Sequence, residues 1–131
     1  IERLPGCRVW GGVPDIRTWL TGGDIALVPL TLARGVQNKV LEAMAMELPV
    51  VLTAAAATGI AAQHGVHFAV ADDDAGLAAQ VVALAHDPTK AQAMGRAARD
   101  FVVSQMSWPA ALAPLAELVC GPPMPGSRHA A

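Results

Sequence analysis

The sequence predicts an α/β fold in which helices cover both faces of a parallel sheet of about four strands. Three observations lead to this prediction. Apolar runs without polar alternation, such as residues 25–28, are typical of strands that are buried on both faces. Stretches with apolar residues at helical spacing separate these runs, and regular alternation of strand and helix favours a parallel sheet. Glycine and proline mark the boundaries between the elements.

The N-terminal elements are a short strand and a short helix. Residues 8–10 are expected to form the strand, which a glycine pair brings to a turn. A proline–aspartate pair then opens a helix over residues 16–21, with Ile16, Trp19 and Leu20 on one face. A second glycine pair stops this helix, because glycine is favoured just past a helix end.

Two buried strands flank the next helix. Residues 25–28 form the second expected strand, which Pro29 ends, and residues 50–52 form the third. Between them a loop leads to a helix over residues 36–46. The inward-facing stripe of this helix is predicted to consist of Val36, Val40, Leu41 and Met44.

The second half of the chain is predicted to add one strand and several helices. An alanine-rich turn and short helix over residues 54–62 precede the fourth strand, residues 67–70. Three aspartates, residues 72–74, are expected to cap an amphipathic helix, because carboxylates suit the positive end of the helix dipole. Its inward stripe is Leu77, Val81 and Leu84. Two further helices begin at Asp87-Pro88 and after Ser107; the inward residues of the first are Met94, Ala97, Ala98, Phe101 and Val102, and the second runs to about residue 119.

The composition fits one globular unit and excludes several classes of function. We expect residues 1–120 to form this unit and residues 121–131 to be a flexible tail. A net charge of −2 and a pI of about 6.0 give no electrostatic signal for nucleic-acid binding. No apolar stretch is long enough to cross a bilayer. Cys7 and Cys120 are interpreted as reduced thiols of a cytoplasmic protein. The four histidines show no metal-ligand spacing, and the chain opens without methionine, as a piece of a longer protein would.

The segment after the second strand is the candidate ligand site. In an open parallel sheet, ligands bind outside the carboxyl ends of the strands, beside helix N-termini. Free backbone N–H groups at the start of the predicted helix favour a phosphate, and Gly35 allows a ligand to approach the backbone closely.

Polar residues follow at helical spacing from this point. Gly35, Asn38 and Glu42 are expected to share one face, with Lys39 one step around. The carboxylate of Glu42 is placed to accept two hydrogen bonds from a vicinal diol such as ribose, and Lys39 is placed to neutralise phosphate charge. Each residue alone is typical of an exposed helix surface; their combination after an apolar strand indicates a nucleotide site.

Three stretches of the sequence resemble the GT4-type glycosyltransferases, which have the GT-B fold. Residues 42–51, EAMAMELPVV, are similar to the family signature EAMA-x-G-x-PVV. Residues 9–29, VWGGVPDIRTWLTGGDIALVP, resemble the segment that precedes the signature, and Ser107-Trp108 resembles the start of the last family helix. The form ARGVQNKVLEAMA is most similar to sugar transferases of bacterial exopolysaccharide and PEP-CTERM loci.

The resemblance implies part of a C-terminal, Rossmann-like domain that binds a nucleotide-diphosphate sugar, expected to be a UDP- or GDP-sugar. It implies retaining transfer without a metal or other cofactor. The acceptor, a glycan or lipid-linked sugar, would be bound by an N-terminal domain, and the intact enzyme would be cytoplasmic or peripheral at the inner face of the membrane. The donor contacts implied by the motif and its flanks are Leu30, Arg34, Gly35, Val36, Asn38, Lys39 and Glu42. No catalytic residue is identified.

Two residues depart from the family pattern. The family pairs two glutamates eight residues apart; Glu42 matches the second, which binds ribose, but Arg34 stands at the first, which contacts the donor sugar. An arginine there is expected to bind diphosphate or the carboxylate of a uronic-acid donor. Glu47 replaces a common glycine, for which we expect a differently built helix end.

The residues also leave two other functions open. A nucleotide-sugar epimerase shares the GT-B fold, although no histidine or carboxylate pair is evident for base chemistry at the sugar. A non-catalytic α/β binding module would keep the motif for packing alone. Nucleotide affinity separates the module from the two enzymes, and product analysis separates transferase from epimerase.

Overall fold

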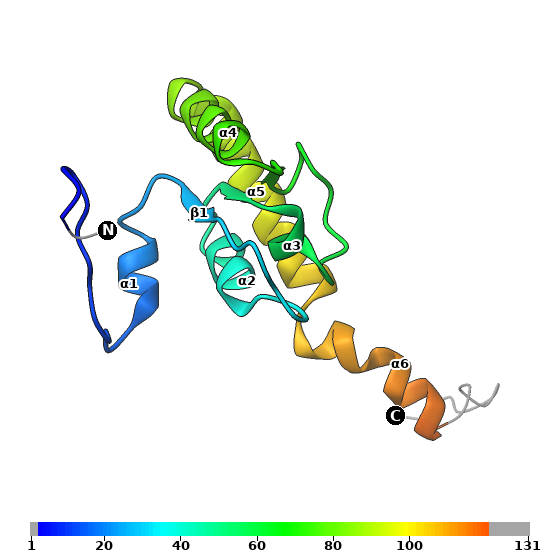
Figure 1. Cartoon of the computed structure of the whole chain (residues 1–131). Coiled ribbons are helices and arrows are strands. Elements are labelled where there is room, and N and C mark those ends of the chain that lie inside the picture. The colour runs from blue at the N-terminus through cyan, green and yellow to red at the C-terminus, as the bar shows by residue number, and fades with distance from the viewer. Residues whose placement is uncertain (1–2, 121–131) are drawn as a thin grey trace.

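Three short parallel strands form the sheet of the computed structural model, which describes residues 3–120 (Figure 1). The strands are β1 (Ala26–Val28), β2 (Val50–Leu52) and β3 (Ala69–Val70), in the spatial order β1-β2-β3. In the register of the sheet, Ala26 is opposite Val50, and Val51 is opposite Ala69. The central strand β2 therefore pairs on both of its edges.

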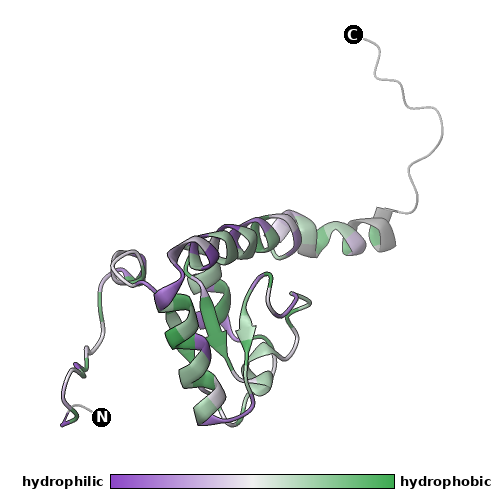
Figure 2. Ribbon diagram, turned by 90° about the horizontal axis from the view of Figure 1, so that it is seen from above, coloured by the Kyte–Doolittle hydropathy of each residue, from purple (hydrophilic) through white to green (hydrophobic). Residues whose placement is uncertain are grey.

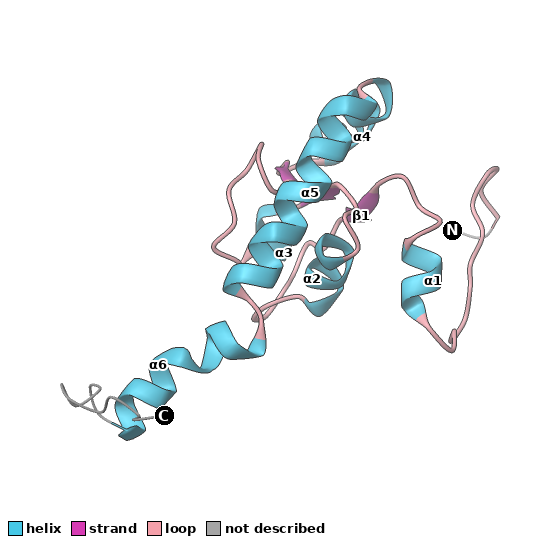
Figure 3. Cartoon of the chain, turned by 180° about the vertical axis from the view of Figure 1, so that it is seen from behind, coloured by secondary structure: helices cyan, strands magenta, loops and turns pink. Residues whose placement is uncertain are grey.

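The helices connect and flank these strands. They are α1 (Ile16–Leu20), α2 (Asn38–Ala45), α3 (Ala54–Ala57), α4 (Asp74–His86), α5 (Pro88–Gln105) and α6 (Trp108–Cys120). Figure 2 shows the hydrophobic strands lying between helices. Figures 1 and 3 show α1 set apart on one side of the sheet and α6 extending away from it beyond the end of α5. Within residues 3–120, no helix combines the length and apolar character that a membrane span requires.

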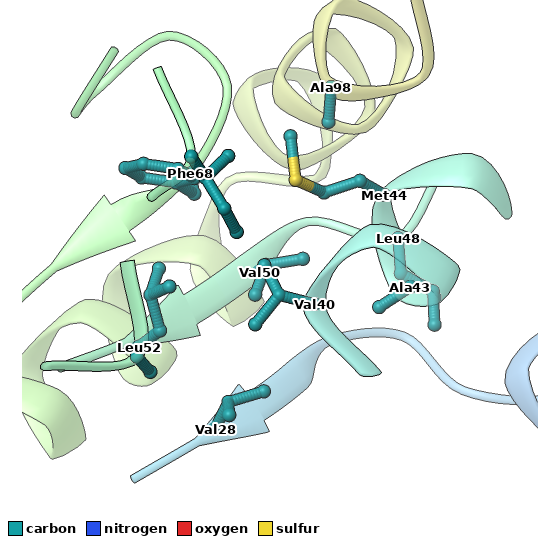
Figure 4. Close-up of a cluster of buried hydrophobic side chains, with 11 residues drawn as sticks. Val28, Val40, Ala43, Met44, Leu48, Val50, Leu52, Phe68 and Ala98 are labelled. Atoms are coloured by element: carbon teal, nitrogen blue, oxygen red, sulfur yellow. The ribbon is translucent and has the colours of Figure 1, made fainter. Parts of the chain in front are cut away.

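Two hydrophobic clusters cover opposite faces of the sheet, because successive side chains of a strand point to opposite faces. Val50 and Leu52 belong to the first cluster, together with Val40 and Met44 of α2. Figure 4 shows Met44 reaching from α2 toward Ala98 of α5. Val51 belongs to the second cluster, with partners on α4 and α5: Leu77, Leu84 and Met94. The two-sided parallel sheet is thus confirmed, as are the inward stripes predicted for α4 and α5, except that Ala97 is only half-buried and belongs to neither cluster.

The strand predicted at residues 8–10 is wrong. This segment is neither helix nor strand, and Val9 and Trp10 are 55% and 59% exposed. Within the described residues β1 hydrogen-bonds only to β2, so residues 8–10 have no partner strand to complete a ladder. Trp10 instead packs on Trp19, with the ring centroids 4.4 Å apart. The sheet accordingly has three strands rather than about four.

Helix α1 begins where it was expected but does not bury its apolar face. Asp15 caps it by accepting a hydrogen bond from the backbone N–H of Arg17 at 2.9 Å. Hydrogen bonds from the Arg17 side chain also lower the pKa of the Asp15 carboxyl. Of the three apolar residues expected to share a face, Ile16 and Trp19 are exposed, and Leu20 is the one that packs against the core. Figure 1 shows this helix set apart from the sheet and its covering helices.

Several other boundaries also differ from the expected ones. Strand β3 begins at Ala69 rather than His67, whose ring nitrogen Nδ1 accepts a hydrogen bond from the Gln63 N–H at 2.9 Å and so closes the preceding loop. Asp73 caps α4 as predicted, accepting from the Gly76 N–H at 2.6 Å. Ser107 stands before α6, with its hydroxyl 3.5 Å from the Ala110 nitrogen. The predicted flexible tail, residues 121–131, lies outside the described residues.

The C-terminal end of α2 has the ordinary geometry of a helix that ends in glycine, although Glu47 stands there. Glu47 has φ of 61°, in the left-handed region. The N–H of Leu48 donates to the Ala43 carbonyl at 3.1 Å, and the N–H of Glu47 donates to the Met44 carbonyl at 3.1 Å. This pair of bonds is the Schellman motif. The expectation of a differently built end is therefore wrong, because the motif's hydrogen bonds impose the left-handed conformation on whichever residue follows the helix.

Gly95 allows α5 to pack closely on this helix end. A Cβ atom at residue 95 would overlap the carbonyl oxygen of Glu47, which is backbone and cannot rotate away. Arg99, one turn further along α5, donates to the Ala45 carbonyl, and its Nε lies 3.5 Å from the Glu47 carboxylate. The end of α2 and the middle of α5 thus form one contact.

We expect Glu47→Gly to stabilise the protein by about 1 kcal/mol, because glycine adopts the left-handed conformation without the cost that other residues bear. The exposed ion pair with Arg99 is worth only a few tenths of a kcal/mol and offsets little of this gain. Urea unfolding of Glu47→Gly and Glu47→Gln measures the two effects separately. Equal stability of the two variants would contradict the prediction.

Gly95→Ala is expected to destabilise the protein by about 1–3 kcal/mol, the cost of overpacking, although alanine is favoured over glycine inside a helix. Thermal and urea unfolding provide the measurement. Gly12→Ala is the control, because a Cβ at residue 12 would meet no atom within 4 Å. A Gly95→Ala variant as stable as the parent would show that the two helices do not pack as described.

Candidate functional site

The carboxyl ends of all three strands meet at one edge of the sheet, since the strands are parallel. A crevice of about 250 Å³ opens there. Its walls come from the segments that follow each strand: Pro29, Leu30 and Thr31 after β1, Thr53, Ala54 and Ala55 after β2, and Asp72, Asp73, Asp74 and Leu77 after β3. Sequence reasoning placed the ligand site at this edge.

The loop between β1 and α2, residues 29–37, is held to the sheet at its first residues. Leu30 is half-buried and packs against the first core cluster. Its carbonyl oxygen accepts a hydrogen bond of 2.6 Å from the hydroxyl of Thr53, the residue that follows β2. The same hydroxyl accepts from the Ala56 N–H at 3.2 Å and so caps α3. Thr53 therefore joins the ends of two neighbouring strands.

The far end of the loop is a turn closed by Gln37. Gly35 has φ of 67°, in the left-handed region, and Gln37 is extended, so α2 begins only at Asn38. The side-chain amide of Gln37 donates to the carbonyl oxygens of Arg34 and Gly35, at 3.3 and 3.1 Å. The prediction that the helix begins at Val36 is wrong, because these bonds and the positive φ hold residues 35–37 outside it.

Because the helix begins late, the expected spacing holds only in part. Asn38 and Glu42 lie one turn apart on α2 and share a face, and Lys39 stands beside them; all three are exposed. Gly35 precedes the helix and is not on that face. Val36 is 41% exposed rather than inward-facing, and its side chain lies against Gly59. Val40 and Met44 are fully buried, as predicted.

The first backbone N–H groups of α2 remain open to a ligand. Gln37 is the N-cap residue, yet its side chain makes no hydrogen bond to the first turn. Within the described residues, the hydrogen bonds of this turn begin with the Val40 N–H, which donates to the Gln37 carbonyl at 2.9 Å. The N–H groups of Asn38 and Lys39 have no acceptor in that set. Such N–H groups and the helix dipole favour an anion.

The charged side chains near this turn are also free of ion pairs in the part of the chain that the structure describes. Arg34, Lys39 and Glu42 are all exposed and occur in neither of its salt bridges. Two cations and one carboxylate are therefore able to meet a ligand without first breaking a bond within the protein.

The three aspartates of the crevice do not form a metal site. Asp73 is engaged as the cap of α4, and among residues 3–120 no group of three or more His, Cys, Asp or Glu side chains is placed to hold a metal ion. Their carboxylates make the β3 side of the crevice acidic, whereas Arg34 and Lys39 give the start of α2 a positive charge.

Thr53 and Gln37 hold the loop between β1 and α2 by hydrogen bonds, and sequence reasoning did not single out either residue. The position of Thr53, directly after an apolar strand, was a usable signal, because that position lies at the carboxyl edge by definition. Gln37 carried no such signal, since its bonds to Arg34 and Gly35 depend on a turn that helical spacing does not predict.

A larger hollow of about 1080 Å³ lies elsewhere, between the residue 61–67 loop and the C-terminal half of α5. Its lining includes Phe101, Val103 and Met106, and the ring of His67 packs on Phe101 with centroids 5.1 Å apart. Its lining includes no segment that directly follows a strand and no helix N-terminus. Size alone therefore does not identify the ligand site.

Comparison with known proteins adds one match. The model of a family described as glycosyl transferases group 1 matches residues 1–87 of the 131. The matched span includes the whole sheet, the loop between β1 and α2, and Thr53. No curated protein matches the chain.

Gly35→Ala is expected to destabilise the protein by about 1–2 kcal/mol, the cost of placing a side chain in the left-handed region. A Cβ at residue 35 would meet no atom within 4 Å, so the effect comes from the backbone conformation alone. Urea unfolding measures it, with Gly11→Ala as a control at an equally open position whose φ is not positive. A loss no larger than the control's would show that residue 35 does not hold this conformation in solution.

Proposed function

The chain belongs to the glycosyl transferases of group 1, and on that basis we propose that its carboxyl edge is the donor site of a retaining glycosyltransferase. The enzyme would move a sugar from a nucleotide-diphosphate sugar to a glycan or lipid-linked acceptor in polysaccharide synthesis. The observation that carries this proposal is the open first turn of α2, which follows the loop that leaves the carboxyl edge of a parallel sheet, where ligands of such folds bind.

The diphosphate of the donor would lie over this first turn. The N–H groups of Asn38 and Lys39 have no acceptor among the described residues, and the cations of Arg34 and Lys39 have no ion-pair partner there. Gly35 keeps the loop backbone free of a side chain at the point of approach. Partial charges and cations together favour a group with several negative oxygens.

The nucleoside would extend along the exposed face of α2. Glu42 stands one turn beyond Asn38 on that face, and its two carboxylate oxygens suit the two hydroxyls of a ribose. Asn38 offers an amide to the same diol or to phosphate. The side chains of Leu30 and Val36, at the two ends of the loop, supply the apolar contacts to the donor.

Arg34 gives the proposed site its particular character. It is exposed and free of ion pairs in the described structure, and it stands where the resembled family has a glutamate that contacts the donor sugar. A guanidinium at this point suits the diphosphate or a sugar that carries a carboxylate. Arg34 is therefore proposed to contact either the diphosphate or the carboxylate of a uronic-acid donor, in place of the sugar contact that the family glutamate makes.

The reaction would depend on positioning and on stabilisation of the leaving group. The bond between the anomeric carbon and the diphosphate breaks, and the diphosphate departs with the bonding electrons and gains negative charge. A hydroxyl oxygen of the acceptor forms the new bond to the anomeric carbon and releases its proton to solvent. The N–H groups of α2, Lys39 and Arg34 would stabilise that charge as it develops. The enzyme would use no metal or other cofactor and would bind the acceptor on a separate domain. It would act in the cytoplasm, where nucleotide sugars are available.

The direct test is a titration of isotope-labelled protein with UDP, GDP, ADP and dTDP, followed through backbone amide shifts. We expect one nucleotide to shift amides of residues 29–42. Glu42→Gln is expected to lower the affinity of the protein for that nucleotide about tenfold or more, because a hydrogen bond to a charged group is worth about 1.5–3 kcal/mol.

Asp100→Asn is the matched control, since Asp100 is also an exposed helix carboxylate but lies on α5. Its nucleotide affinity should equal that of the parent. Equal weakening by both variants, or shifts confined to another part of the molecule, would contradict the assignment of Glu42.

A further inference from the structure

Two side chains, one from after β2 and one from the loop's own last residue, hold the loop of residues 29–37 in place. Thr53 donates to the carbonyl of Leu30 at 2.6 Å, near the start of the loop. Gln37 donates to the carbonyls of Arg34 and Gly35 at 3.3 and 3.1 Å, near its end. Between these anchors, residues 31–33 make no hydrogen bond to the rest of the described chain.

All three anchored groups are carbonyl oxygens, and this choice matters for an anionic ligand. A carbonyl oxygen carries partial negative charge and repels phosphate, whereas an N–H group attracts it. When Thr53 and Gln37 occupy the carbonyls, these oxygens point toward the donating side chains rather than toward a ligand. The backbone N–H groups at the start of α2 keep no acceptor within the described residues.

Gln37 is suited to this task because its side chain does not cap its own helix. Ser, Thr, Asp or Asn at the N-cap position bonds the N–H groups of the first turn and so occupies the groups that a phosphate needs. Gln37 instead directs its amide back to the loop and leaves the first turn uncapped. The helix is therefore less stable at this end than a capped helix would be, and the N–H groups of its first turn stay free to donate to a ligand.

We propose that Thr53 and Gln37 are positioning residues, which hold residues 29–37 in the one conformation that presents the first turn of α2 to the diphosphate. This inference rests on the proposed function for its ligand, but the ordering of the loop is a property of the free protein. Neither side chain needs to touch the donor. Loss of either anchor lowers the fraction of molecules with a competent loop, and the apparent dissociation constant rises by the same factor.

The test compares Thr53→Val and Gln37→Met, which keep the shape of the side chain and remove its donor. Each is expected to raise the dissociation constant for the nucleoside diphosphate about three- to tenfold, the worth of a net hydrogen bond. Thr53→Ser retains the hydroxyl and should bind within about twofold of the parent. Thr89→Val and Gln80→Met, on α5 and α4, are the matched controls and should bind as the parent does.

A second readout separates positioning from general loss of stability. Backbone 15N order parameters of residues 30–37, measured without ligand, should fall in Thr53→Val and Gln37→Met and remain unchanged in Thr53→Ser and the controls. Thr53→Val also removes the cap of α3, whereas Gln37→Met removes no cap, so agreement between the two variants assigns the effect to the loop.

The outcomes distinguish this inference from the proposed function. Parent-like affinity and parent-like order parameters in both variants would overturn the positioning role. If the parent binds none of the four nucleoside diphosphates at millimolar concentration, the proposed function fails. The order parameters then decide the positioning role by themselves: a loosened loop in both variants supports it, and an unchanged loop overturns it.

Discussion

The fold depends on the complete burial of its central strand. The side chains of Val50, Val51 and Leu52 have no exposed surface, and they alternate between the two hydrophobic clusters. A strand enclosed in this way must pair its backbone on both edges and be covered on both faces, because water cannot reach its polar groups. The parallel neighbours β1 and β3 pair with its two edges, and helices on either side cover its two faces.

The candidate site is a consequence of the same arrangement. Parallel strands bring their carboxyl ends to one edge, and each is followed by a helix whose first N–H groups point toward that edge. Thr53 follows the buried strand β2 and donates a hydrogen bond to the segment that follows β1. A single residue therefore connects the core strand to the loop. The rigid sheet thereby provides the fixed frame on which a short loop can be ordered.

The sequence was sufficient to predict the elements whose apolar residues are buried. It was insufficient where an element depends on a neighbouring strand or on particular hydrogen bonds. The apolar runs of β1 and β2 and the stripes of α4 and α5 were predictable, since each has one periodicity and one place to pack. Residues 8–10 have strand-like composition but no neighbouring strand within the described residues, and composition does not reveal a missing partner strand.

The start of α2 was misplaced because a positive φ at Gly35 and two hydrogen bonds from Gln37 override helical spacing. The positions of Asn38, Lys39 and Glu42 were nevertheless anticipated, as they lie within the helix under either boundary, whereas their roles rest on the proposed function.

Helix α5 belongs to the folded domain, although the match to the family ends before it. It contributes Ala98 to one cluster and Met94 to the other, and at Gly95 it contacts the end of α2. The match to the family model covers residues 1–87, and α5 begins at the next residue, Pro88. A chain divided at that boundary would keep the whole sheet together with α2 and α4, but each hydrophobic cluster would lose the residues that α5 contributes to it. The span that matches the family model and the span that completes the two hydrophobic clusters are therefore different lengths of the same chain.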